Sequence, residues 1–231
     1  CDFGTEVNET INSNVIDYFN YLSKLINEGR LKEINNLTPS YNKLLVGFDL
    51  SLTNYNKIKD VILNLKIEKD EIKQSTKVNI PICCDEDYGI DFNRLSEKLK
   101  LSKKEILSLY LNKEYFCYMT GFIAGMPFLG DVKKEIRCER LETPRVKVPK
   151  GSVGITEQFA NIYTFESPGG WNIIGKTPKK IFIKSNLKDP ALIKPGDKVV
   201  FYQISKKEYL NWNDWFIFWN TESRDQYNYS R

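Results

Sequence analysis

The sequence predicts an α+β protein in which a small α/β unit precedes a β-rich barrel or sandwich, and two observations lead to this expectation. The N-terminal third alternates apolar residues at helix spacing with short extended apolar runs. From Tyr115 onward, short apolar runs are separated by closely spaced Gly and Pro residues, which is typical of all-β units. The 231 residues, 41% of them hydrophobic, can bury one large or two small cores.

The first helix is indicated by apolar residues that recur at helix spacing. Asn12 or Ser13 is its expected N-cap, and Gly29 lies at a suitable position just beyond its C-terminal end. The residues that define its apolar face are Val15, Ile16, Phe19, Leu22 and Ile26.

Two extended runs, 31–37 and 43–50, follow this helix and are joined by the turn signal Thr38-Pro39-Ser40-Tyr41. A second helix begins near Asn54, and a short strand covers 78–83. The chain opens with Cys-Asp-Phe-Gly and no initiator Met, which indicates a truncated opening strand, with a lipid-anchored N-terminal Cys as the alternative. The resulting order, βαββαβ, is the ferredoxin-like pattern.

A helical bridge over 91–112 separates this unit from the β-rich part. Asp91 is the expected N-cap of a helix with Leu95 and Leu99, and Ser102 to Glu105 form a capping box that opens a second helix. The expected organisation is an α/β unit over 1–77, a β-barrel unit with the helical bridge over 78–206, and a Trp-rich tail over 207–231.

The composition excludes several classes of chemistry. No histidine is present, which removes the commonest general base, the Ser-His and Cys-His nucleophile pairs and most zinc sites. The G-x-x-x-x-G-K-[ST] phosphate loop is also missing from the sequence. A net charge of +4 from 34 basic and 30 acidic residues is too small and too evenly spread for nucleic-acid binding. No apolar run is long enough to span a membrane.

The five cysteines are Cys1, Cys83, Cys84, Cys117 and Cys138. Because their number is odd and no C-x-x-C pair occurs, we expect no disulfide framework and a cytoplasmic location. The adjacent residues Cys83 and Cys84 are expected to be small, half-buried side chains rather than a redox pair.

Three segments between Gly121 and Pro178 are candidates for function. The glycines of 121–130 suit a loop whose backbone approaches a ligand, or a tight barrel corner. Arg145 follows a proline and is suited to hold a carboxylate or phosphate, or to form a surface ion pair. Trp171 follows the reversal Pro168-Gly169-Gly170 and either faces a ligand or plugs one end of the barrel.

These motifs occur in a fixed order along the chain: Gly151-Ser152-Val153-Gly154-Ile155, Ile162-Tyr163, Glu166-Ser167-Pro168-Gly169-Gly170-Trp171 and Ile174-Gly175-Lys176-Thr177-Pro178. Supporting matches are Gly121-Phe122, Gly125, Pro127, Leu129-Gly130, Thr143-Pro144-Arg145, Val148-Pro149 and, upstream, Pro81-Ile82-Cys83, Asp85-Glu86 and Tyr88-Gly89. The combination resembles the family of the 5-oxoprolinase B subunit, which also contains a sporulation kinase A inhibitor and allophanate hydrolase subunit 1. The likeness covers residues 1–206.

The resemblance implies a cyclophilin-like β-barrel after the α/β unit, and a partner. The partner would be a second cyclophilin-like protein, the 5-oxoprolinase C subunit, which works with the A subunit to open 5-oxo-L-proline to L-glutamate with ATP. This chain alone would bind no cofactor, and ATP would be used by the complex. Non-catalytic binding to a sensor histidine kinase, or a role in an allophanate hydrolase or urea carboxylase, is the alternative. A prolyl isomerase rests on fold likeness only.

The implied site is a cleft that binds substrate or partner, with no assigned catalytic residue and no metal. Its residues are Thr143, Pro144, Arg145, Ser152, Gln158, Tyr163, Glu166, Ser167, Pro168, Gly169, Gly170 and Trp171. Arg145 would hold an anionic group, and Arg145, Glu166, Ser167 and Trp171 would face the partner barrel.

The chain departs from the family pattern in two places. Ala124, Met126 and Phe128 occupy variable positions of the first Gly-rich segment. The pattern Gly-Ile-Ala-Gly-Gly-Gln-Thr-Gly-Ile-Tyr-Pro is altered at 156–161 and at Thr164, so that Phe159 stands at the usual glutamine position and Gln158 lies one residue early. A one-residue shift reverses the face of a strand, so either a bulge restores the glutamine or its polar function is lost.

The tail lies outside the resemblance. Trp212, Trp215, Phe216 and Trp219 share one face of a helix, which suits protein docking or an interfacial membrane helix, or a helix folded back over the barrel. The low basic content nearby disfavours the membrane.

Overall fold

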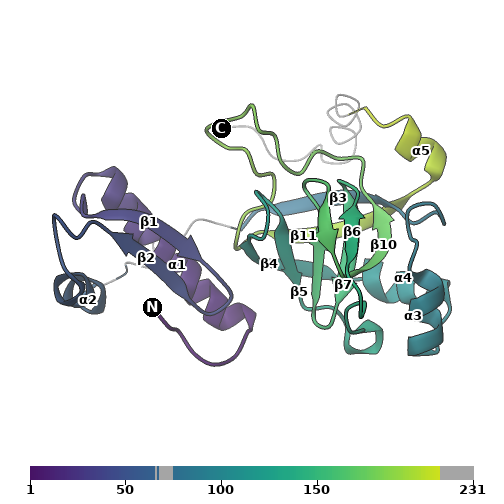
Figure 1. Ribbon diagram of the computed structural model, residues 1–231, viewed down its shortest axis with the longest axis horizontal. Helices are drawn as coiled ribbons and strands as arrows, with labels where there is room; N and C mark the ends of the chain where they lie inside the picture. Colours follow the sequence, from purple (N-terminus) through teal and green to yellow (C-terminus); the bar gives the residue numbers. More distant parts are fainter. Residues whose placement is uncertain (66, 68–74, 214–231) are drawn as a thin grey trace, which may run out of the picture.

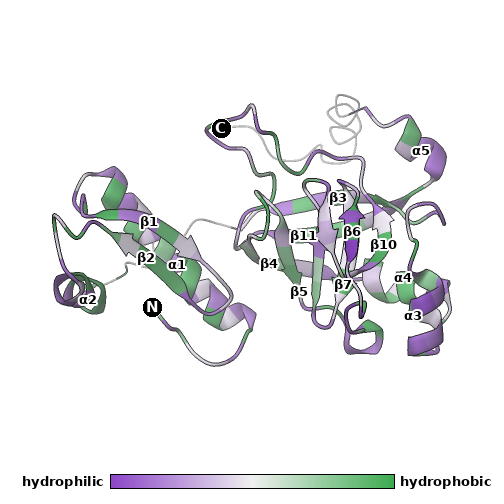
Figure 2. Ribbon diagram, viewed as in Figure 1, coloured by the Kyte–Doolittle hydropathy of each residue, from purple (hydrophilic) through white to green (hydrophobic). Residues whose placement is uncertain are grey.

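The computed structural model describes residues 1–65, 67 and 75–213, and it confirms the α+β fold class. A small N-terminal unit of helices and a hairpin lies beside a closed β-barrel (Figure 1). Each part has its own buried apolar cluster. Hydrophobic residues concentrate in α1, the hairpin and the barrel strands, whereas the surface helix α3 is largely hydrophilic (Figure 2).

The N-terminal unit packs two helices against a β-hairpin. Its elements are α1 (Glu9–Asn27), β1 (Ile34–Pro39), β2 (Leu44–Phe48) and α2 (Tyr55–Leu63). The core between them consists of Val15, Leu22, Leu25, Leu31, Ile34, Leu44 and Ile58. Residues 1–3 run antiparallel beside β2, with backbone hydrogen bonds in both directions between Cys1 and Leu44. The expected hairpin and both helices are therefore present.

The expected N-cap of the first helix is wrong. Asn8 caps α1, because its backbone is extended and its Oδ1 accepts a hydrogen bond from the Ile11 amide at 2.9 Å. Asn12 lies one turn inside the helix and is fully buried. The C-terminal end agrees with the prediction, since Gly29 has a φ of +72° and its amide binds the Ile26 carbonyl.

The last strand of the expected βαββαβ pattern belongs to the barrel. β3 (Lys77–Cys83) pairs in parallel with β11 (Lys198–Ile204) along its whole length. Ile80 and Ile82 are fully buried in the barrel core, which is why this strand joins the larger sheet. Among the described residues, the N-terminal sheet consequently consists of the β1–β2 hairpin, without the closing strand of a ferredoxin-like unit.

The barrel closes in the order β10-β3-β11-β4-β5-β8-β7. Besides β3 and β11, the barrel contains β4 (Glu114–Thr120), β5 (Pro127–Gly130), β7 (Ser152–Thr156), β8 (Phe159–Ile162) and β10 (Asn172–Lys176). Alternate residues point inward to one core, as Ala160 and Ile162 do on β8. Phe159 and Asn161 therefore lie on the outer face of the barrel wall.

Helices and a two-stranded ribbon flank the barrel. The bridge helices α3 (Phe92–Leu99) and α4 (Lys103–Leu111) pack on the barrel core, and α4 begins with the expected capping box. A two-stranded ribbon of β6 (Arg145–Val148) and β9 (Ser167–Gly169) covers part of the outer wall. The short helix η2 (Lys134–Ile136) precedes this ribbon, and α5 (Lys206–Leu210) follows β11.

The N-terminal unit contacts the outer wall of the barrel through Asn12 and Tyr41. The Asn12 Nδ2 group donates to the carbonyls of Ser40, Tyr41 and Tyr118, at 2.8, 2.6 and 3.1 Å. The ring of Tyr41 lies 5.0 Å from that of Phe159 and 6.3 Å from that of Tyr118. One buried amide thus joins the α1 helix, the β1–β2 turn and strand β4.

Among the described residues, no helix is long and apolar enough to cross a membrane. All five cysteines are free, as expected, and Cys83 and Cys84 are both buried. The Trp-rich helical face at 212–219 lies outside the described residues, apart from Trp212.

We predict that native thiols react very unevenly. Burial raises the pKa of Cys84 to about 12 and also raises the pKa of Cys117 and Cys138, so these thiols stay protonated at mildly alkaline pH. Titration with a disulfide reagent should modify the exposed Cys1 quickly and all five cysteines only in denaturant. Rapid modification of a second thiol in the native protein would contradict the burial described here.

We further predict that Asn12→Ala weakens the junction between the two units. The substitution leaves buried carbonyls without their shared donor, which costs about 1–3 kcal/mol of unfolding free energy. Urea unfolding measures the loss. Asn14→Ala, an exposed position on the same helix, is the control and should stay within about 0.5 kcal/mol of the parent. Equal stability of the two variants would show that the Asn12 hydrogen bonds contribute nothing.

Candidate functional site

The outer wall of the barrel is covered from both sides and partly open in between. The N-terminal unit covers β4, through Tyr41 against Tyr118. The β6–β9 ribbon covers the other side, where Met126, Val148, Tyr163 and Ile173 form a small buried cluster. Between these covers lies a strip of outward-facing residues from β5 and β8, which we call the outer strip: Phe128, Phe159 and Asn161.

The ribbon is fixed to the barrel by a partly buried ion pair. The Nη2 group of Arg145 lies 2.6 Å from the Oδ1 atom of Asp91, whose side chain is only 6% exposed. The other carboxylate oxygen of Asp91 accepts the Ile173 amide at 2.6 Å. Asp91 stands at the expected N-cap position of α3, but its side chain makes no capping hydrogen bond; the carboxylate instead holds β6 and β10 together. Arg145 is therefore part of a structural pair through Nη2, while its Nη1 group is buried without a hydrogen-bond partner.

Trp171 is buried against the strip. It is 6% exposed, and its ring packs edge-to-face with Phe128 at a centroid distance of 5.7 Å. The guanidinium carbon of Arg140 lies 5.9 Å from the centroid of the Trp171 ring, at the distance of a cation–π contact. Arg140 itself is exposed. The indole thus forms one wall of the strip and supports an exposed cation.

Tyr163 lies beneath the ribbon, and the position of its side chain requires a glycine at residue 169. A Cβ atom at Gly169 would come within 2.1 Å of the Tyr163 hydroxyl, so only glycine leaves room for this phenol. Burial raises the pKa of Tyr163, and the Asn161 side chain followed by the charges of Arg140 and Arg145 opposes that rise. Two cations therefore act on this one buried hydroxyl.

The altered segment 156–161 is a regular hairpin. Strands β7 and β8 pair in register, without a bulge. The paired residues are Val153 with Ile162, Gly154 with Asn161, Ile155 with Ala160 and Thr156 with Phe159. Gln158 is consequently in the turn and is not returned to the strand. The face that the family pattern gives to glutamine carries Phe159 here, and Asn161 two residues later brings an amide to the same face.

Asn161 is the polar residue of the outer strip. It is fully buried, and its Oδ1 atom accepts the Gly154 amide at 3.2 Å. Its Nδ2 group lies beside the Tyr163 hydroxyl but has no acceptor within full hydrogen-bonding geometry. A Cβ atom at Gly154 would lie 2.8 Å from the Asn161 Oδ1 and 3.0 Å from the Trp171 Cβ. Gly154 therefore lets the amide and the indole approach each other.

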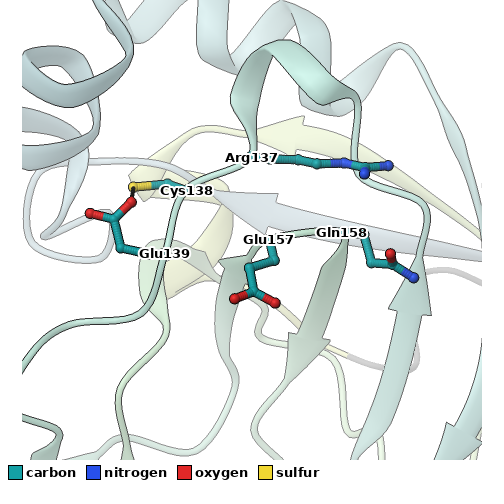
Figure 3. Close-up of a pocket in the computed structure, with 5 residues that line it drawn as sticks. All are labelled: Arg137, Cys138, Glu139, Glu157 and Gln158. Carbon is teal, nitrogen blue, oxygen red and sulfur yellow. Dashed lines mark hydrogen bonds between the residues drawn. The ribbon is translucent and has the colours of Figure 1, made fainter.

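A separate shallow pocket of about 250 Å³ opens beside the β7–β8 turn (Figure 3). Arg137, Cys138 and Glu139 line it from the segment after η2, and Glu157 and Gln158 line it from the turn. Glu139 is paired with Lys98 and Arg94, and the hydrogen bond from Lys98 holds its pKa at about 2. Of the expected cleft residues, Gln158 alone borders this pocket.

The remaining expected residues are divided between surface and interior. Glu166 is exposed and pairs with Lys147 at 3.2 Å. Ser167 is buried, and its hydroxyl donates to the Phe165 carbonyl. Thr143, Pro144 and Pro168 are exposed, whereas Ser152 and Gly170 are buried. The structure brings Arg145, Tyr163, Gly169 and Trp171 together around the ribbon. Glu166 lies at the ribbon but its carboxylate is exposed, and Gln158 lies apart in the β7–β8 turn.

Sequence reasoning missed Tyr41, Asp91, Arg140 and Asn161 as functional candidates. The signals were weak, because each residue acquires its neighbours from distant parts of the chain. The described residues contain no cluster of three or more His, Cys, Asp or Glu side chains that suits a metal ion. The 121–126 segment joins β4 to β5, so it forms the corner of a barrel hairpin.

Comparison with known proteins identifies relatives across most of the chain. Residues 1–193 match the family described as carboxyltransferase domain, subdomain C and D. The 5-oxoprolinase B subunit of Bacillus subtilis (strain 168) is 34% identical over 223 residues, which is 90% of this chain and 89% of that protein. The 5-oxoprolinase B subunit of Haemophilus influenzae (strain ATCC 51907 / DSM 11121 / KW20 / Rd) is 37% identical over 55% of this chain and 60% of its own length.

A solved structure shows the same fold within a longer polypeptide. The crystal structure of TTHA0988 matches with a TM-score of 0.78 and 26% identity. The match covers 89% of this chain but only 39% of that chain.

We predict that Asp91→Ala destabilises the protein far more than the loss of a surface pair. The variant leaves the Arg145 guanidinium without its partner and the Ile173 amide without an acceptor, which costs about 3–5 kcal/mol. Lys147 lies on β6, the strand of Arg145, and Lys147→Gln breaks the exposed pair with Glu166. This substitution should cost about 0–1 kcal/mol. Denaturant unfolding compares the two, and similar losses would refute the structural role of Asp91.

Proposed function

Because the chain belongs to the family of carboxyltransferase domains, subdomains C and D, we propose that it is one component of an ATP-dependent 5-oxoprolinase, which converts 5-oxo-L-proline to L-glutamate. The 34% identity with the Bacillus subtilis 5-oxoprolinase B subunit over 90% of the chain carries this proposal. The motif-based resemblance to that family is confirmed by the same match.

In this proposal the chain acts in the cytoplasm, as one part of a heteromer. The sequence has no histidine and no G-x-x-x-x-G-K-[ST] loop, so the A subunit is the proposed site of ATP use. A second cyclophilin-like protein, the C subunit, is the proposed neighbour at the barrel. The exposed residues Thr143, Pro144, Glu166 and Pro168 on and beside the ribbon are proposed contacts to that neighbour.

Lactam opening poses a problem that suits a divided site. An unactivated amide is a poor electrophile, and coupling to ATP makes hydrolysis of a stable lactam favourable. Such a reaction needs a group that holds the substrate carboxylate, walls that exclude water, and donors for the amide oxygen. The outer strip offers aromatic surface and an amide donor, the neighbouring Arg140 offers a cation, and the partner proteins would supply the remaining groups.

We predict ATP-dependent glutamate release when this chain is co-expressed with the A and C subunits from the same genome. The purified complex should form glutamate from 5-oxo-L-proline only when ATP is present, and each component on its own should be inactive. The assay is enzymatic detection of glutamate, with omission of each component in turn as the control. A stable complex without glutamate formation, or the lack of any complex, would refute the proposed function. Tight binding to a sensor histidine kinase in that case would favour the regulatory alternative.

A further inference from the structure

Arg140 differs from the other arginines of the described chain. Arg30 pairs with Glu28, Arg94 pairs with Glu139, and Arg145 pairs with Asp91. Arg137 donates from Nε to the Val132 carbonyl. For Arg140 the structure shows one side-chain contact, the ring of Trp171, and no carboxylate among the described residues pairs with it.

The position of Arg140 suits it to bind an anion. Contact with the face of an indole restrains the guanidinium and leaves N–H groups at its edge for a carboxylate, which it can bind through two parallel hydrogen bonds. Its charge acts on Tyr41 from the N-terminal unit and on Tyr163 from the barrel. Arg140 therefore lies near both covers of the outer strip.

The surroundings of Arg140 match a small ring that carries an amide. Phe128, Phe159 and Trp171 present apolar surface, and the Tyr41 ring lies 5.0 Å from Phe159 and 6.2 Å from Phe128. The buried Nδ2 group of Asn161 lies beside the Tyr163 hydroxyl but has no acceptor in full hydrogen-bonding geometry, and a buried donor without such a partner is costly unless a ligand or water satisfies it. A carbonyl oxygen would satisfy it.

We propose that the outer strip and the neighbouring Arg140 bind the carboxylate substrate, with Arg140 holding the carboxylate. The aromatic rings of Tyr41, Phe159 and Trp171 surround the lactam ring of the substrate, and Asn161 donates to the lactam carbonyl. The proposal rests on the 5-oxoprolinase function for the identity of the substrate. It assigns the anion-binding role to Arg140, because Arg140 is exposed, whereas Arg145 is paired with Asp91 through Nη2 and its Nη1 group is buried. It also gives the N-terminal unit a function, since Tyr41 forms one side of the site.

The decisive variant is Arg140→Gln in the assembled complex. Loss of a charge-assisted contact should raise the KM for 5-oxo-L-proline about 10- to 100-fold, because such contacts contribute that factor to affinity. Arg140→Lys keeps the charge but loses the fork geometry and should recover part of the affinity. Arg30→Gln removes one exposed positive charge in the N-terminal unit and should leave KM unchanged. An unchanged KM for Arg140→Gln in an active complex overturns the proposed site and leaves the proposed function standing.

Direct binding separates the two proposals if the complex is inactive. The purified chain is titrated by calorimetry with 5-oxo-L-proline, with 2-pyrrolidinone, which has the lactam without the carboxylate, and with cyclopentanecarboxylate, which has the carboxylate without the lactam. Saturable binding of the carboxylates that is lost in Arg140→Gln supports the site even when the function fails. No carboxylate-dependent binding to the chain or to the complex overturns it.

Discussion

The arrangement of the outer wall depends on the carboxylate of Asp91. A nearly buried carboxylate is costly to desolvate, and it is tolerated here because both of its oxygens are paired, one with Arg145 and one with the Ile173 amide. The two partners lie on different strands, β6 and β10, so this single group fixes the ribbon onto the barrel. The ribbon in turn positions Trp171, which immediately precedes β10. Disruption of the pair would displace the indole as well as the arginine.

The ion pair also decides which arginine is available. Asp91 takes the Nη2 group of Arg145, and the Nη1 group, although it has no hydrogen-bond partner, is buried where a soluble anion does not reach it. Arg140 has no such commitment in the described chain and remains exposed above the indole. The division of roles between two arginines five positions apart therefore follows from burial.

The parts of the fold that sequence reasoning predicted are those determined within a few residues. The Asn54 cap of α2, the Ser102–Glu105 capping box and the left-handed Gly29 involve partners at most four positions away. The parts it missed involve distant partners. Asp91 meets Arg145 at a separation of 54 residues, and Asn12 meets Tyr118 at 106. In both cases a residue with good capping chemistry is used for a tertiary contact, which local spacing cannot reveal.

The same limit explains the altered segment at 156–161. From sequence, Phe159 at the usual glutamine position indicated the loss of a polar function unless a bulge restored Gln158, and the hairpin is regular. However, residues two apart on a strand share a face, so Asn161 places an amide next to the position where the glutamine would lie. Phe159 then adds an aromatic surface that meets Tyr41 at 5.0 Å, a contact that a glutamine would not make. The two departures are coupled: one side chain closes the strip against the N-terminal unit, and the other keeps a hydrogen-bond donor inside it.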